Sequence, residues 1–547
     1  MDTQVNPVLN RILSSNRDTD FGRKYHFENI KTTAAFRNIV PITTYDDYAP
    51  LVELTTRLGE KDIFTSRPLA GYSLTSGSTG VPRLIPCTQE HIKRYSEQFK
   101  ALSAKGSSFV LISGMPRNRP YADGTYLDSV MGATIFDYKA KIKDNSHRRK
   151  FASGAWTSPL ELLFPEELPE TNHLRMLFAL LDPNVEQIIA PFCWGVLDAL
   201  LYMEREWEQL LQDMETGSIS SKVILSEELR EKLNSKIRKS PKRAATLRAI
   251  FEAGFDEPVI PRIWPGCKQV LAVGTGSFCI YAQKLRRFTG TIPLCNGFYA
   301  SSEALIGRAV SNDNDEYLLM SDLGFFEFLP PGGGEPLLAQ QLTPGETYEV
   351  ILTNDSGFYR YRLGDTIRVL RFQGDLPIFT YEYRTNQVFS FFAEEMNEQH
   401  VQSAVFALQE KTGILFEDFG FWPEEDQTAY TILVEPVYSQ KNHQALQNVA
   451  LAELEALADT LLGEANPSYA AERSVNHLKP CHVRYVQPQT YLLYRDLESA
   501  RKRMPNDQAK PVRCVDNIVK EKFFFSMLDK DLHTEEECEY YLSKFRN

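Results

Sequence analysis

Residues 74–86 read LTSGSTGVPRLIP, a stretch that follows a short strand-like segment and turns polar before Pro82. Six of the seven residues from Thr75 to Val81 are Ser, Thr or Gly. Glycine readily takes positive φ and lets backbone N–H groups converge, and the hydroxyls add further donors. A loop of this composition can hold phosphate oxygens. The expected phosphate contacts are Ser76, Gly77, Ser78, Thr79 and Gly80.

Arg83 stands just beyond this loop, where a polyphosphate needs a fixed positive charge. Short Ser/Gly motifs have low specificity, however, and a flexible hydrophilic loop is the alternative interpretation. Both interpretations stay open on this stretch alone.

A second motif, Asn296-GFYASSEALIG, follows the apolar run Thr291-IPLC. Tyr299 is suited to stack on a planar ring, and Glu303 supplies the hard oxygen ligand that Mg²⁺ prefers when it also binds phosphates. The alternative is a surface turn in which Tyr299 packs in the core and Ser301 caps a helix.

A third motif is Asn354-DSGFYRYRLGDTIRVL. Two sets of side chains alternate from residue 358 to 363, which predicts a strand with two distinct faces. Gly364 then permits a tight bend, and the Asp365 carboxylate can accept hydrogen bonds from two neighbouring hydroxyls, as in ribose binding. The alternative is a charged edge strand in which Asp365 pairs with Arg362 or Arg368.

Composition and pattern together predict an α/β fold. The chain has 547 residues, 43% of them apolar and 24% charged, as in ordinary folded proteins. Up to about residue 385, apolar runs such as Gln269-VLAVG alternate with helical patterns. Pro330-PGGGEP has the residues of a turn between two antiparallel strands.

The pattern changes after about residue 390 to helix (396–411), strand (from 430), helix (446–462) and strand (from 482). We therefore expect a large domain over 1–385 and a compact α+β domain over 386–547, with the hinge near Arg384.

Net charge, cysteine spacing and hydropathy indicate which partners and which cellular compartment to expect. Sixty Lys and Arg against 72 Asp and Glu give a net charge of −12, so nucleic acid is not an expected partner. The eight cysteines lack zinc-site spacing and the density of a disulfide scaffold, which favours a reducing compartment. No secretory signal is evident, and the apolar run at 188–197 is well short of the ~20 residues that cross a bilayer. We expect a soluble, cytoplasmic protein without membrane contact.

Common catalytic signatures are absent from the sequence: HExxH, GxSxG, GxxxxGK[ST] and GxGxxG do not occur. Taken in order, however, the three motifs resemble those of the adenylate-forming superfamily, which includes luciferases and acyl-CoA ligases. LTSGSTGVPRLIP resembles the phosphate loop of the plant hormone-conjugating branch, Tyr299-ASSE its second motif and Tyr361-RLGD its third. From about residue 40 to 515 the chain is similar to the acyl acid–amido synthetases of the auxin-responsive Gretchen Hagen family.

This resemblance implies a large N-terminal adenylate-forming domain, with mixed β-sheets and flanking helices, and a small α+β lid that rotates between half-reactions. ATP and Mg²⁺ are the implied cofactors. The implied nucleotide contacts are the phosphate loop, Tyr299 at adenine, Ser302, Asp365 at the ribose and Arg384 at the hinge. Glu303 is the implied metal ligand.

The segment Ala509-KPVRCV resembles the lysine-containing loop of the lid, so Lys510 is, with Arg83, the implied catalytic cation. A solvated basic loop that includes Arg513 is the alternative. The chain departs from the family where Tyr383 replaces the hinge glycine and Arg83 a lysine. A third departure is that the Gly-Glu-Lys after the hinge reads Ala-Glu-Glu at 393–395.

The implied reaction is adenylation of a small carboxylic acid by ATP, followed by transfer of the acyl group to the amine of an amino acid. One alternative acceptor is a thiol of coenzyme A or of a carrier protein. Another alternative is a nucleotide-binding homologue without turnover, which the missing lid lysine suggests. The product made with amines or thiols, and single-turnover adenylate formation, separate the three.

Overall fold

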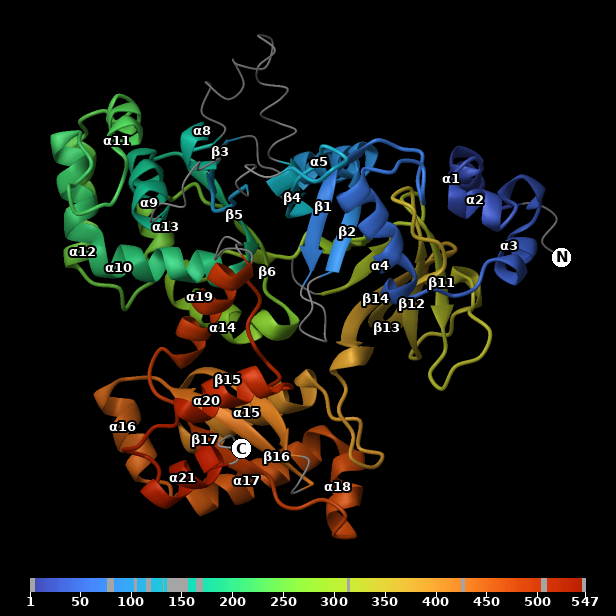
Figure 1. The fold of residues 1–547 in the computed structure, drawn as a ribbon. Coiled ribbons are helices and arrows are strands. Elements are labelled where there is room, and N and C mark those ends of the chain that lie inside the picture. The colour runs from blue at the N-terminus through green and yellow to red at the C-terminus, as the bar shows by residue number, and fades with distance from the viewer. Residues whose placement is uncertain are drawn as a thin grey trace. The chain divides into compact units, whose positions relative to one another are not determined.

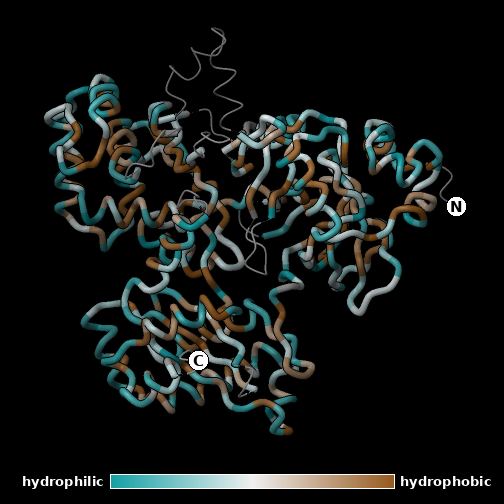
Figure 2. Tube along the Cα trace, in the orientation of Figure 1, coloured by the Kyte–Doolittle hydropathy of each residue, from teal (hydrophilic) through white to brown (hydrophobic). Residues whose placement is uncertain are grey.

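The computed structural model describes residues 5–75, 83–102, 106–114, 120–130, 132–134, 156–163, 171–311, 315–424, 428–502 and 509–543. The chain divides into two compact units, Met1–Tyr381 and Glu382–Asn547, called here the N-terminal and C-terminal units (Figure 1). In both units hydrophobic and hydrophilic stretches alternate along the chain (Figure 2).

The helices of the N-terminal unit form an N-terminal group and a group around a parallel sheet, and one helix between these groups in the chain packs against an antiparallel hairpin. The described helices are α1 (Pro7–Asn16), α2 (Asp20–Lys24), α3 (Thr33–Ile39), α4 (Tyr45–Glu53), α5 (Gln89–Leu102), α8 (Leu160–Leu163), α9 (Thr171–Leu181), α10 (Cys193–Thr216), α11 (Glu227–Asn234), α12 (Pro241–Glu252), α13 (Ile260–Ile263) and α14 (Cys279–Thr289). Asn6 caps α1 by accepting from the Val8 and Leu9 amides, and Pro7 occupies the first helical position, where its missing N–H has no cost.

The parallel sheet has the order β3-β5-β6-β7, formed by β3 (Ser107–Val110), β5 (Val185–Phe192), β6 (Gln269–Val273) and β7 (Leu294–Cys295). Helix α10 packs against β5 and against α9, α12 and α14. Parallel strands that are covered by helices consist of continuous apolar runs. Such runs can be recognised in the sequence.

A hairpin carries the first motif. Strands β1 (Leu69–Thr75) and β2 (Arg83–Thr88) pair antiparallel up to Thr75 opposite Arg83, and β4 (Leu127–Asp128) extends the sheet beside β1. The connection between β1 and β2 is the stretch 76–82, which lies outside the described residues.

The second and third motifs belong to one seven-stranded sheet of order β11-β12-β13-β14-β10-β9-β8. Its strands are β8 (Phe298–Ala300), β9 (Leu305–Ala309), β10 (Tyr317–Leu319), β11 (Phe325–Leu329), β12 (Thr347–Thr353), β13 (Tyr361–Gln373) and β14 (Leu376–Arg384). Strands β11 and β12 pair antiparallel on either side of the glycine-rich segment after Pro330, as its turn residues predicted.

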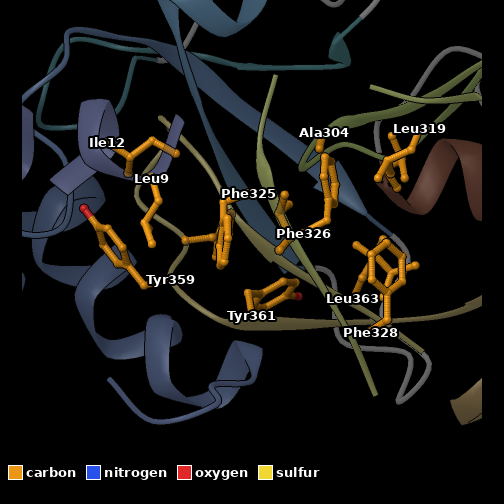
Figure 3. Close-up of a cluster of buried hydrophobic side chains, with 14 of the residues drawn as sticks. Leu9, Ile12, Ala304, Leu319, Phe325, Phe326, Phe328, Tyr359, Tyr361 and Leu363 are labelled. Atoms are coloured by element: carbon orange, nitrogen blue, oxygen red, sulfur yellow. The ribbon is translucent and has the colours of Figure 1, made fainter. Parts of the chain in front are cut away.

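One hydrophobic core joins this sheet to the N-terminal helices (Figure 3). Leu9 and Ile12 of α1 lie in the same cluster as Phe325, Phe328 and Tyr361, and all five are buried. Helix α1 therefore contributes to the domain core.

The predicted two-faced strand from residue 358 is wrong in its first three residues. Strand β13 begins at Tyr361, and Arg360 has a φ of 49° with only 4% of its surface exposed. The Arg360 guanidinium makes two hydrogen bonds of 2.9 Å to the Glu327 carboxylate and one of 2.9 Å to the Val40 carbonyl. This buried ion pair holds the backbone in a region that a strand does not visit.

The C-terminal unit has a three-stranded sheet of order β15-β16-β17, with β15 and β16 antiparallel and β16 and β17 parallel. Its elements are α15 (Glu398–Thr412), β15 (Phe416–Glu424), β16 (Ala429–Pro436), α16 (Gln440–Gln447), α17 (Leu451–Ala465), α18 (Pro467–Ser474), β17 (His482–Tyr485), α19 (Thr490–Lys502), α20 (Ile518–Ser526) and α21 (Glu535–Ser543). The predicted helix over 446–462 is wrong at its start, because α16 ends at Gln447 and α17 begins only at Leu451.

Candidate active site

The second and third motifs meet at their side chains. The Tyr299 hydroxyl on β8 donates a hydrogen bond of 2.5 Å to Asp365 Oδ2 on β13. The Tyr299 ring also lies 5.8 Å from that of Phe379 and 5.7 Å from that of Tyr381, both on β14. Strands β8 and β13 are four places apart in the sheet order, so the hydrogen bond joins two strands that do not pair with each other.

Asp365 follows a local irregularity of β13. The register between β12 and β13 shifts near Gly364, which has a φ of 81° that glycine takes without strain. Arg362, one of the two cations considered as partners of Asp365, instead forms an ion pair with Glu349 at 2.5 Å. Asp365 is 7% exposed, and its carboxylate accepts a hydrogen bond from the Tyr299 hydroxyl.

Glu303 lies in a tight turn between β8 and β9. Ser301 Oγ accepts from the amides of Glu303 and Ala304, each at 3.2 Å, and the Ser301 amide donates to the Ala304 carbonyl at 2.9 Å. Ser301 thus caps a turn rather than a helix. Glu303 is 5% exposed, so a carboxylate is buried at the position where the second motif predicts a metal ligand.

The turn is tied to the strand that leads into the phosphate loop. Ser302 Oγ lies 3.2 Å from Ser73 Oγ, and Ser73 is on β1. The loop residues themselves, Ser76, Gly77, Ser78, Thr79 and Gly80, lie outside the described residues.

Arg83 is the first residue of β2. Its guanidinium lies 5.3 Å from the centre of the Tyr45 ring, a cation–π contact. Burial raises the pKa of Tyr45, the charge of Arg83 lowers it and that of Glu303 raises it further. Arg83 therefore packs against Tyr45 of α4 at the start of β2.

Side chains of α5 also contact the Glu303 turn, and the sequence interpretation did not include them. The Tyr95 hydroxyl donates to the Ser301 carbonyl at 2.5 Å. Burial and the nearby Arg94 lower the pKa of His91 to about 4, while a hydrogen bond with the Ser302 backbone opposes the shift. His91 is therefore neutral at pH 7. No short motif marks these residues, because their partners lie about 200 positions away.

Arg384 and Lys510 belong to the C-terminal unit. Arg384 ends β14 and is half-buried, and Lys510 is exposed. Arg513, in the same basic segment, is only 5% exposed. It donates to Asp418 Oδ1 at 2.5 Å and lies 4.4 Å from the centre of the Phe419 ring. The solvated-loop alternative is therefore wrong for Arg513, which anchors the segment next to β15.

Residues 393–395, where the chain departs from the family that it resembles, form a tight loop. The buried Glu394 carboxylate accepts from the Phe391 amide at 2.7 Å, the Phe392 amide at 3.1 Å and the Tyr430 hydroxyl at 2.6 Å. Burial would raise the pKa of Glu394, but these hydrogen bonds outweigh it and lower the pKa. The next residue, Glu395, is exposed with a φ of 45°.

A complete protein-made metal site is absent from the described residues, which contain no cluster of three or more His, Cys, Asp or Glu side chains. Mg²⁺ is commonly bound by one or two carboxylates together with substrate phosphates. A single buried carboxylate at Glu303, beside the strand that enters a phosphate loop, fits that type of coordination.

Three domains of one known family match the chain in order. Residues 2–294 match the GH3 family N-terminal domain, residues 317–384 its central domain and residues 399–518 its C-terminal domain. The chain belongs to the GH3 family. The resemblance inferred from the three motifs is thereby confirmed.

Similar GH3 proteins are named as amido synthetases. The probable indole-3-acetic acid-amido synthetase GH3.1 of Arabidopsis thaliana is 26% identical, over 94% of this chain and 89% of that protein. The jasmonoyl–L-amino acid synthetase JAR4 of Nicotiana attenuata is 27% identical, over 73% of this chain and 72% of that protein.

A solved GH3 structure confirms the fold. The GH3.15 acyl acid amido synthetase superposes with a TM-score of 0.80 at 22% identity, covering 96% of this chain and 94% of that chain. The predicted α/β class is correct. Among the described helices, none is both long enough and apolar enough to cross a bilayer.

Proposed function

We propose that this GH3 protein is an ATP-dependent acid–amino acid ligase. In the first step an oxygen of a carboxylic acid attacks the α-phosphorus of ATP, an acyl-adenylate forms and pyrophosphate leaves. In the second step the neutral amine of an amino acid attacks the acyl carbon, the amide bond forms, AMP leaves with the electrons of the broken C–O bond, and the amine nitrogen releases one proton. The amine must arrive neutral because its lone pair forms the new bond.

The observation that carries this proposal is the meeting of Tyr299 and Asp365 beside the buried Glu303 turn in a chain of the GH3 family. The aromatic ring of Tyr299 offers a surface for adenine, and the Asp365 carboxylate offers an acceptor for ribose hydroxyls. Ser302 and the loop residues 76–80 are the proposed phosphate contacts.

Mg²⁺, bound by Glu303 together with phosphate oxygens, would supply charge neutralisation on the ATP phosphates. Among the protein groups, Arg83 and Lys510 are the proposed cations that stabilise the charge developing on the transferred group. Arg384 is proposed at the hinge between a domain of residues 1–385 and a lid of residues 386–547. We also propose the cytoplasm as the compartment, from the sequence composition.

The acceptor amine is supported by the relatives. GH3.1 is named as a probable indole-3-acetic acid-amido synthetase and JAR4 as a jasmonoyl–L-amino acid synthetase, whereas their names mention no thiol acceptor. The acids in those names, together with aryl and aliphatic acids, form the first panel of substrates.

The test is exchange of labelled pyrophosphate into ATP with Mg²⁺ and each acid of the panel, followed by mass spectrometry of products with amino acids and with coenzyme A. Acid-dependent exchange and an amide product are the expected results. A thioester and no amide would overturn the choice of acceptor. ATP binding without adenylate formation in a single turnover, with every acid, would favour a non-catalytic homologue.

A further inference from the structure

The Ser301–Glu303 turn is held by side chains from two other segments. Tyr95 of α5 donates to the Ser301 carbonyl at 2.5 Å, and Asn354 Nδ2 donates to the Glu303 carbonyl at 2.8 Å. The two acceptors flank Ser302, so the main chain is fixed on both sides of the predicted nucleotide contact.

Burial and hydrogen bonds fix the position of the Asn354 side chain. It is 3% exposed, and its Oδ1 accepts from the Ser356 amide at 3.0 Å and the Phe358 amide at 3.1 Å. Its acceptor side thus organises the loop after β12, and its donor side reaches Glu303. A buried amide with all these bonds cannot rotate without leaving polar groups unpaired, which is costly.

Tyr95 is an equally fixed donor. Its side chain is 5% exposed, and burial raises the pKa of Tyr95, with further contributions from Cys87 and Glu303. The hydroxyl therefore keeps its proton throughout the physiological range and donates to the carbonyl.

We propose that Tyr95 and Asn354 are positioning residues that hold the Glu303 carboxylate in place for Mg²⁺. The inference rests on the proposed function. Both residues donate to main-chain carbonyl groups of the turn, those of Ser301 and Glu303. Groups that orient a metal ligand in this way commonly change metal affinity by about 10–100-fold when they are removed.

Tyr95→Phe is the first test, because it removes one hydroxyl and keeps the ring. Tyr359→Phe is the matched control: Tyr359 is also fully buried, and its hydroxyl also donates to a main-chain carbonyl, that of Phe64 at 2.8 Å. The measurement is the rise in unfolding temperature that ATP gives as Mg²⁺ is titrated, with ATP and EDTA as the metal-free arm.

For Tyr95→Phe we expect the Mg²⁺ concentration at half-maximal shift to rise about 10-fold, with a smaller change in ATP binding in EDTA. Pyrophosphate exchange should need more Mg²⁺ and recover at high Mg²⁺, which a general structural defect would not do. The control should match the wild type. An unchanged Mg²⁺ requirement in Tyr95→Phe would overturn the inference.

Asn354→Asp is the second variant, and it serves if Tyr95→Phe does not fold. The carboxylate still accepts from Ser356 and Phe358 but cannot donate to Glu303, so the same rise in Mg²⁺ requirement is expected; its absence would overturn the inference. A wild-type protein whose ATP binding does not respond to Mg²⁺ would overturn the proposed metal role itself, and the inference with it. The measurement on the wild type alone therefore distinguishes failure of the proposed metal role from failure of the inference about Tyr95 and Asn354.

Discussion

The Tyr299 hydroxyl and Asp365 Oδ2 lie 2.5 Å apart, although the two residues are 66 positions apart in the chain and their strands are not paired. The contact lies beside the rings of Phe379 and Tyr381. The second and third motifs thus meet, although their strands are four places apart in the sheet order. A planar base and a hydroxylated sugar are the ligand groups that we propose for this pair of residues.

Asp365→Ala should weaken ATP binding by roughly 1–3 kcal/mol, because hydrogen bonds between the carboxylate and ribose hydroxyls are lost. Asp365→Asn keeps an acceptor for Tyr299 and should lose less. Calorimetric titration with ATP measures both, and Asp375→Ala, in the exposed turn between β13 and β14, is the control. Unchanged affinity in Asp365→Ala would show that the ribose is bound elsewhere.

Lys510→Ala should slow acid-dependent pyrophosphate exchange by about 10²-fold while ATP affinity changes little, since the lysine is proposed to act on charge that develops during the reaction. Lys522→Ala, another exposed lysine of the same unit, is the control. Exchange rates at saturating ATP, compared with calorimetric affinities, separate the two effects. Equal rates in Lys510→Ala and Lys522→Ala would remove Lys510 from the reaction.

Several elements and the separate motifs were predictable from the sequence, because they depend on local signals. Strand β16 at 429–436 follows from a short apolar run, and the turn between β11 and β12 follows from its glycines. The family follows from three motifs in a fixed order.

The side chains that hold the Glu303 turn in place were not predictable, because they belong to segments that approach it only in the folded protein. Tyr95 and Ser301 are 206 positions apart, and Asn354 and Glu303 are 51 apart. The backbone of Arg360 likewise leaves the strand region because Glu327 binds its guanidinium, and periodicity carries no information about that partner.

Asp459→Asn should destabilise the C-terminal unit by about 1–3 kcal/mol at pH 7, because the partly buried carboxylate binds the Arg473 guanidinium through two bonds of 3.0 Å. Burial would raise the pKa of Asp459, but hydrogen bonds from Arg473, Tyr469 and the Cys481 amide outweigh it and lower the pKa. The stabilisation is therefore present above pH 3.8 and is lost as the pH falls below that value.

Hydrogen exchange of peptides from β17, corrected for the intrinsic rate at each pH, measures the opening free energy of this unit in the intact chain. The difference between Asp459→Asn and the wild type should shrink as the pH falls from 7 to 3. Asp531→Asn, an exposed aspartate, is the control. A difference that is the same at both pH values would mean that the charge of Asp459 contributes nothing.

Glu435 gives the opposite dependence on pH. It is 4% exposed on β16, where its carboxylate accepts from the Gln489 amide at 2.6 Å and the Tyr491 amide at 3.1 Å, at the start of α19. Burial, with smaller contributions from Asp418 and Glu417, raises the pKa of Glu435 to about 7 against the opposing effect of these amides. Between pH 4.5 and 7 the folded state keeps a proton that the unfolded state has lost, so stability falls as the pH rises.

Glu435→Gln cannot titrate, so its stability relative to the wild type should increase by up to about 3 kcal/mol between pH 5 and pH 8, since each unit of pKa shift corresponds to about 1.4 kcal/mol. Urea unfolding of the intact protein, followed at peptides from β16, measures the change, and Glu453→Gln on the exposed side of α17 is the control. Titrations shared by variant and wild type cancel in this comparison. A relative stability that stays constant from pH 5 to pH 8 would mean that Glu435 is ionised in the folded protein over the whole range and that the α19 amides outweigh its burial.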